Sequence, residues 1–229
     1  REIHGNKIKL LESSRNIGMV PNFLRTINEC ESKYVALLEG DDYWINPLKL
    51  QIQFDALEGD KSISFVAHDA FVFSRIDDLK KVNYFTSFKK NSYFSISYIL
   101  SEWLFPTASI VFRKELLIIP DWFINIRNWD WAIQILLASK KHGYYIDEPM
   151  SIYRKHLGGN SFNPDYSTEK TLMRQVKLLK LLQYELPNQE KYFLKALKSK
   201  ENRLKIYKLK LKYPLLYYIT RPRRSFYNL

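Results

Sequence analysis

A short apolar run that ends in a cluster of carboxylates is the feature that most constrains how this chain can fold. Residues 34–38 are Tyr-Val-Ala-Leu-Leu, and Glu39, Asp41 and Asp42 follow within four residues. The run predicts a buried strand, and in open α/β sheets ligands bind beyond the carboxyl ends of the strands. Carboxylates so close together repel one another unless a cation shares them, and a hard divalent metal ion is the obvious candidate. The alternative is a solvated acidic turn.

Strand and helix patterns alternate along the first 164 residues, which predicts an α/β layer fold. We expect strands at residues 7–11, 34–38, 62–67, 108–112 and 144–146. We expect helices at residues 21–30, from 46 through 54, and at 131–139, with Gly143 closing the last of them.

The composition changes beyond residue 164. From residue 165 onward there are sixteen Lys and Arg against five Asp and Glu, a net charge of +11, whereas residues 1–164 hold twenty against nineteen. Helical periodicity covers residues 168–182 and 189–213, with Pro187 between them. We therefore divide the chain into an α/β core, residues 1–164, and a basic helical extension, residues 165–229.

Cysteine content and hydropathy favour a cytoplasmic location. The single cysteine, Cys30, permits no internal disulfide and fits a reducing compartment. The first residues lack the apolar stretch of a signal peptide. The most apolar neighbourhood, residues 92–112, is interrupted by Glu102 and Pro106, which makes it a poor membrane span.

Three separated groups of residues resemble, in their order and spacing, the motifs of the family 2 glycosyltransferases. They are Asn16-Ile17-Gly18 with Asn22 and Arg25, then Glu39-Gly40-Asp41-Asp42-Tyr43-Trp44, then Asn128-Trp129-Asp130-Trp131 with the segment 142–161. The match covers roughly residues 7–163. The resemblance implies the GT-A fold and an enzyme that transfers a sugar, with inversion, from a nucleotide-diphosphate sugar to an acceptor hydroxyl. A UDP-sugar is the favoured donor, and bacterial surface glycan synthesis is the expected setting.

The resemblance also implies roles for the acidic turn and for the loop that follows residue 153. Asp41, Asp42 and His156 are the expected ligands of a Mn²⁺ or Mg²⁺ ion that assists the departing diphosphate. Glu39 stands where the family commonly has Asp and is expected to reach the donor ribose. Arg154 is expected to neutralise phosphate, with a surface charge as the alternative. Gly158 and Gly159 suit a loop that closes over the donor.

The remaining expected site residues lie in the first and third groups. Asp130 is the expected catalytic base, because inversion needs a group that deprotonates the attacking hydroxyl. An N-terminal helix cap is the alternative role for Asp130, and the two roles are compatible. Trp129 offers a stacking face for a sugar, although aromatic residues beside a helix start are more often core. The expected donor-binding residues of the first group are Asn16, Gly18 and Arg25.

Members of this family begin with a β-α-β unit that binds the nucleotide base and ribose. No such pattern precedes Lys7, so we expect an N-terminally truncated copy of the fold, or a chain that begins within a longer protein.

The basic extension indicates a second type of contact. Leu204, Tyr207 and Leu211 share a helical face, and the flanking and following basic residues are Lys198, Lys205, Lys208, Lys212, Arg221, Arg223 and Arg224. This pattern suits an anionic membrane surface and hence a glycan or lipid-linked acceptor. A solvated lysine face is an equal alternative, and nucleic acid is the least favoured partner. The alternative function is an inactive remnant that binds membranes or RNA through this extension.

Overall fold

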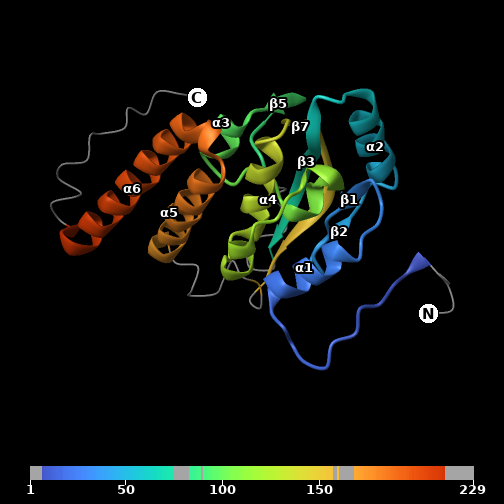
Figure 1. Cartoon of the computed structure of the whole chain (residues 1–229), viewed down its shortest axis with the longest axis horizontal. Coiled ribbons are helices and arrows are strands. Elements are labelled where there is room, and N and C mark those ends of the chain that lie inside the picture. The colour runs from blue at the N-terminus through green and yellow to red at the C-terminus, as the bar shows by residue number, and fades with distance from the viewer. Residues whose placement is uncertain (1–6, 75–82, 89, 157–158, 160–167, 215–229) are drawn as a thin grey trace.

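A computed structural model describes residues 7–74, 83–88, 90–156, 159 and 168–214 (Figure 1). The expectations for Gly158 and for the basic residues at 221–224 lie outside the described residues. Within them the protein has a mixed α/β fold, as the sequence predicts. Helices cover both faces of one curled sheet, and a helical hairpin lies beside it (Figure 1).

In the described part of the chain, seven strands form one mixed sheet with the hydrogen-bonded order β1-β6-β3-β7-β2, while β4 pairs with β3 and β5 with β7. The strands are β1 (Tyr34–Ala36), β2 (Tyr43–Trp44), β3 (Ile63–Ser74), β4 (Asn83–Tyr84), β5 (Ser92–Phe94), β6 (Val111–Arg113) and β7 (His142–Lys155). β3 runs parallel to β7, and β6 is antiparallel to both β1 and β3. The strands β1, β3 and β7 therefore point the same way, and their carboxyl ends meet at one edge of the sheet.

Helices pack on both faces of the sheet. α1 (Met19–Asn28), α3 (Ile96–Ile99) and α4 (Trp129–Ala138) share the larger apolar core with the face that carries Phe65 and Ala67. α2 (Lys49–Gly59) covers the other face over a smaller cluster that includes Leu57 and Val66. Almost every residue of α4 is buried, so its position relative to the sheet is fixed by packing.

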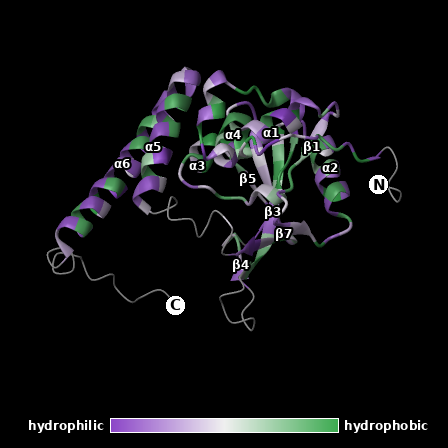
Figure 2. Cartoon of the chain, turned by 90° about the horizontal axis from the view of Figure 1, so that it is seen from below, coloured by the Kyte–Doolittle hydropathy of each residue, from purple (hydrophilic) through white to green (hydrophobic). Residues whose placement is uncertain are grey.

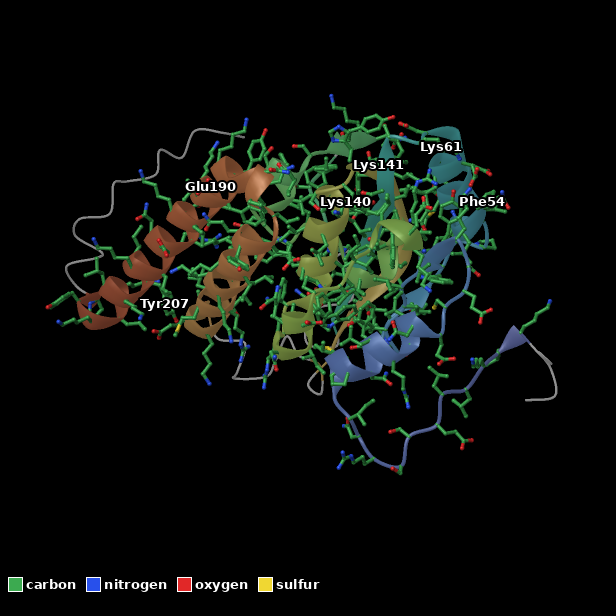
Figure 3. All side chains as sticks on the ribbon, viewed as in Figure 1. Phe54, Lys61, Lys140, Lys141, Glu190 and Tyr207 are labelled. Atoms are coloured by element: carbon green, nitrogen blue, oxygen red, sulfur yellow. The ribbon has the colours of Figure 1, made fainter. Side chains whose placement is uncertain are left out.

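The basic extension forms an antiparallel helical hairpin, α5 (Thr168–Glu185) and α6 (Glu190–Lys212), which confirms the two predicted helices. Leu178, Leu182 and Phe193 join the larger core, so the hairpin is anchored on the α4 side of the sheet. Figure 3 labels Glu190 near the start of α6 and Tyr207 farther along it, where the helix extends past the core. Within the described ranges no helix is long and apolar enough to cross a bilayer.

The strand predicted at residues 7–11 is wrong. Residues 8–13 have no regular secondary structure, and the side chains of Ile8 and Leu10 are 66% and 64% exposed. No described strand pairs with this segment, and an apolar alternation without a partner strand does not bury its side chains. The segment is held instead by local contacts, among them an ion pair between Lys9 and Glu29.

Two strands, β3 and β7, are much longer than predicted. β3 continues through Asp69, because the buried carboxylate of Asp69 accepts hydrogen bonds from the backbone N–H groups of Ala70 (2.8 Å) and Thr86 (2.9 Å).

Gly143 does not close α4, which Ser139 caps. It lies in β7, where an added Cβ would come within 2.4 Å of the ring of Phe65. A glycine is needed there for packing.

Candidate active site

A cleft of about 400 Å³ opens at the edge of the sheet where the carboxyl ends of β1 and β7 meet. Its lining comes from the turn after β1, the 3₁₀ turn before β6, the start of α4, the end of β7 and the inner side of α5. The expected site residues that line it are Glu39, Asp41, Trp129, Asp130, Arg154 and His156. Segments more than 110 residues apart in the sequence thus converge on one hollow.

The pairing of β2 with β7 brings the acidic turn to the basic end of β7. Tyr43 lies opposite Ile152, so the residues just before Tyr43 meet those just after Ile152. His156 Nε2 is 3.3 Å from Asp41 Oδ2, and Arg154 Nε donates to the main-chain oxygen of Asp41. The side chains of Asp41 and His156 are 45% and 38% exposed, so both are accessible from the cleft.

Asp42 faces inward rather than toward solvent. Its Oδ1 accepts the backbone N–H of Arg154 at 2.9 Å, which fastens the acidic turn to β7. Its Oδ2 is buried and has no hydrogen-bond partner among the described residues. Burial raises the pKa of Asp42 to about 6, and the charge of Asp41 adds to the effect.

Only part of a metal coordination sphere is present in the described residues, where no group of three or more His, Cys, Asp and Glu could hold a metal ion. Asp41 and His156 provide an exposed carboxylate and an imidazole side by side. A Mg²⁺ or Mn²⁺ ion usually takes one or two carboxylates from the protein and the rest of its ligands from phosphate and water. The pair therefore fits an ion that arrives with a diphosphate.

Asp130 lies in the first turn of α4 and is not its N-cap, a position that Asn128 occupies. The backbone N–H groups of Trp131 and of Asp130 itself act to lower the pKa of the carboxyl, as expected for an acid at a helix start. Burial outweighs these donors and raises the pKa of Asp130 to about 6. Asp130 is therefore mainly ionised at neutral pH and close to the pKa that suits a general base.

Glu39 lies deeper than a simple acidic turn would place it. It lines the cleft and also an adjoining hollow of about 360 Å³ between α1 and β1. Burial raises the pKa of Glu39 to about 7, and the negative charge of Asp130 contributes further, against a hydrogen bond from Thr107. Two carboxyl groups therefore face the same space and resist ionising together.

Aromatic side chains form one wall of the cleft. Trp129 is only 6% exposed and lies 4.5 Å, centroid to centroid, from the ring of Phe23, so most of its surface belongs to the core. Trp103 and Tyr153 also line the cleft, and the ring of Phe85 packs against both of them at 5.1 and 5.2 Å. Flat aromatic faces of this kind suit the apolar side of a sugar ring.

The first group of expected residues does not reach the cleft. Asn16 accepts the backbone N–H of Gly18 at 2.8 Å, and Gly18, with φ of 88°, begins α1. Arg25 donates to the main-chain oxygens of Leu11 and Glu12 and so holds the N-terminal segment against α1. These three residues shape the chain beside the site rather than its lining.

Several lining residues were missed by the sequence analysis. They are Met19, Trp103, Thr107, Arg127, Tyr153, Thr171 and Gln175. Arg127 precedes Asn128 and Tyr153 precedes Arg154, so their position next to motif residues could have indicated them. Thr171 and Gln175 carry no such signal, because only the packing of α5 against the core brings them to the cleft.

No model of a known protein family matches the chain. An uncharacterized protein from Mycobacterium bovis and one from Mycobacterium tuberculosis are each 29% identical to it over 147 residues, which is 63% of this chain and 41% of the relative. The chain therefore spans less than half the length of these curated relatives. Their names state no activity, so a function has to be argued from the site.

Proposed function

We propose that this protein is a glycosyltransferase with the GT-A fold, related to family 2, that transfers a sugar with inversion from a nucleotide-diphosphate sugar, with UDP as the favoured nucleotide. The observation that carries the proposal is the convergence of Asp41, Asp130 and His156 on one cleft. Asp41 comes from the second of the groups that resemble the family and Asp130 and His156 come from the third, and a chance resemblance gives no reason for the two groups to meet.

The chain's own residues account for the acceptor side of the reaction. The carboxylate of Asp130 takes the proton of the acceptor hydroxyl while that oxygen bonds to the anomeric carbon of the donor. The bond from the anomeric carbon to the diphosphate oxygen breaks on the opposite side, and the diphosphate leaves with the electron pair. The partly buried position of Asp130 in the first turn of the well-packed helix α4 would hold the carboxylate in a constant orientation for this proton transfer.

Positively charged groups would serve the departure of the diphosphate. Asp41 and His156 would hold the divalent ion, whose chemistry is to neutralise the departing diphosphate. Arg154 and Arg127 line the same cleft and add positive charge near the position of a phosphate group. The proposal includes a location at the cytoplasmic face of the plasma membrane, with which the free thiol of Cys30 agrees. It also includes a glycan or lipid-linked acceptor.

Isothermal titration with Mn²⁺ and a panel of nucleotide diphosphates and their sugars tests the proposal. We expect Mn²⁺-dependent binding that Asp41→Asn weakens and that Asp130→Asn leaves intact, together with sugar transfer that Asp130→Asn removes. Undiminished transfer by Asp130→Asn, or no Mn²⁺-dependent binding of any nucleotide in the panel, contradicts it. Such a result with intact membrane binding would favour the alternative of a non-catalytic binding module.

A further inference from the structure

An apolar groove of about 510 Å³ lies along α5, with one lining residue from α6 and one from a 3₁₀ turn of the core. We define the apolar groove by its lining, which is Trp122, Met173, Val176, Lys177, Lys180, Leu181, Tyr184 and Leu204. Trp122 comes from the 3₁₀ turn at Asp121–Asn125, and its Nε1 lies 3.4 Å from a carboxylate oxygen of Glu185. This contact fixes the indole beside the end of α5.

The groove runs along the side of α5 opposite its fully buried leucines, and its half-buried residues Trp122, Val176 and Leu181 also pack against the larger core. Met173, Lys177, Lys180 and Tyr184 follow one another at intervals of three or four residues, which places them on one helical face. Leu172, Leu179 and Leu182, on the other side of the helix, are buried in the core. The side chains of Met173 and Tyr184 are 50% and 89% exposed. Figure 2 shows hydrophobic residues recurring along both helices among hydrophilic ones.

Positive charge surrounds the groove. From residue 168 to residue 212 there are thirteen Lys and Arg against four Glu, a net charge of +9. Two of those glutamates are already in ion pairs, Glu201 with Lys180 at 3.2 Å and Glu169 with Lys208 at 3.5 Å. The hairpin therefore presents an excess of cations around exposed aromatic and aliphatic side chains.

We propose that the apolar groove docks the protein on an anionic lipid bilayer. Trp and Tyr prefer the boundary between hydrocarbon and water, and lysine stems lie along apolar surface while their ammonium groups reach lipid phosphates. RNA is less well matched, because Met173, Val176 and Leu181 offer nothing to a phosphate backbone. A second copy of the chain is also less well matched, because two hairpins of +9 repel each other.

Membrane docking through the apolar groove does not depend on the transfer reaction, yet it would affect the position of the cleft. Thr171 and Gln175 of α5 line the cleft, while Met173 and Val176 of the same helix line the groove. A bilayer on the groove would hold the cleft near the membrane surface, within reach of an acceptor attached to a lipid.

Vesicle cosedimentation of the full chain tests this inference. We compare vesicles of phosphatidylcholine alone with vesicles that contain one quarter phosphatidylglycerol, at low and at high salt. We expect binding to the anionic vesicles that weakens as salt rises. The double variant Met173→Ser with Tyr184→Ser and the double variant Lys177→Gln with Lys180→Gln should each lower the affinity by about tenfold or more.

Matched controls separate the groove from general effects. Leu48→Ser with Leu50→Ser removes two exposed leucines, 61% and 46% exposed, from the α2 side of the molecule. Lys61→Gln with Lys141→Gln removes two lysines that Figure 3 places near α2, away from the hairpin, and Lys61 pairs with Glu58 as Lys180 does with Glu201. Both control variants should bind vesicles as the unchanged protein does.

Three outcomes overturn the inference. The first is no binding to anionic vesicles, or an equal loss in the control variants. The second is binding of a single-stranded RNA that displaces the vesicles and survives the serine pair at Met173 and Tyr184. The third is a concentration-dependent dimer in sedimentation velocity that the same serine pair dissociates, which would assign the groove to a second copy.

Discussion

The two faces of the central sheet both bury ionisable groups, and on one of them these groups lie at an open cleft. On the α4 side, Glu39 and Asp130 lie at the wall of a cleft. On the α2 side, Lys49 is 1% exposed. Its Nζ donates to Gln53 Oε1 at 2.7 Å and lies 4.3 Å from the centroid of the Trp44 ring. The two regions differ in whether a ligand can reach their ionisable groups and not in whether these groups are buried.

Displaced pKa values occur in both regions and so do not by themselves mark a site. Burial raises the pKa of Asp130 to about 6 and lowers the pKa of Lys49 to about 7. Burial also lowers the pKa of His68 to about 3, and its Nε2 has no hydrogen-bond partner among the described residues. On the α2 side these groups are enclosed in the core, whereas on the α4 side they lie where a ligand in the cleft could contact them.

The largest expected effect is the loss of transfer on changing the proposed base. Asp130→Asn keeps the shape of the side chain but cannot take a proton, so we expect the transfer rate to fall by about 1,000-fold. The measurement is single-turnover transfer with the best donor from the nucleotide panel. Asp147→Asn changes an exposed carboxylate outside the cleft and should retain full activity. A loss of less than about tenfold would break the assignment of Asp130.

Removing the exposed carboxylate of the acidic turn should affect binding more than folding. Asp41→Asn is expected to lower the Mn²⁺-dependent affinity for UDP by about 10–100-fold, because a neutral amide is a weaker ligand for a hard cation. Isothermal titration with and without Mn²⁺ measures this change. Asp55→Asn on α2 is the matched control. Equal affinity in the two variants would place the ion elsewhere in the cleft.

Lys49 should make stability depend on pH on the closed face of the sheet. In the unfolded chain Lys49 holds its proton to about pH 10, whereas in the folded protein it loses the proton near pH 7. The unfolded state therefore binds more protons between these values, and the free energy of unfolding should rise by about 2 kcal/mol from pH 7 to pH 9.

Lys49→Met should abolish this rise in urea unfolding measured at the two pH values, whereas Lys140→Met, at an exposed position, should keep it. Transfer activity should not change, because Lys49 does not line the cleft. A rise that persists in Lys49→Met would show that another group carries it.

The smallest expected effect is a gain in stability that accompanies the loss of transfer in Asp130→Asn. A raised pKa means that the ionised carboxylate destabilises the fold, with no penalty below about pH 4 and the full penalty above about pH 6. Allowing for its partial exposure, we expect Asp130→Asn to gain about 1 kcal/mol in unfolding free energy at pH 8 and nothing at pH 4. An equal gain at both values would assign the change to packing instead of charge.

Local patterns predicted the parts of this protein that depend on neighbouring residues. Periodicity located α4, α5 and α6 to within a few residues, and the acidic turn follows a short strand as predicted. The same reasoning failed at residues 7–11, where the apolar alternation has no partner strand. It also ended a strand at residue 67, whereas β3 continues through Asp69, whose carboxylate accepts the backbone N–H of Thr86. Pairing between distant segments is invisible to a pattern read one window at a time.

The sequence by itself determined the α/β class, the basic hairpin and the chemical types of the residues that the proposed site requires. Only the tertiary structure decided that His156 meets Asp41, because the parallel course of β1 and β7 and the register of β2 bring their ends together. It also decided that Asn16, Gly18 and Arg25 remain outside the cleft, and that one side of α5 lines the cleft while another lines a groove. These outcomes depend on which surfaces pack against each other, a choice made by the whole chain rather than by any segment of it.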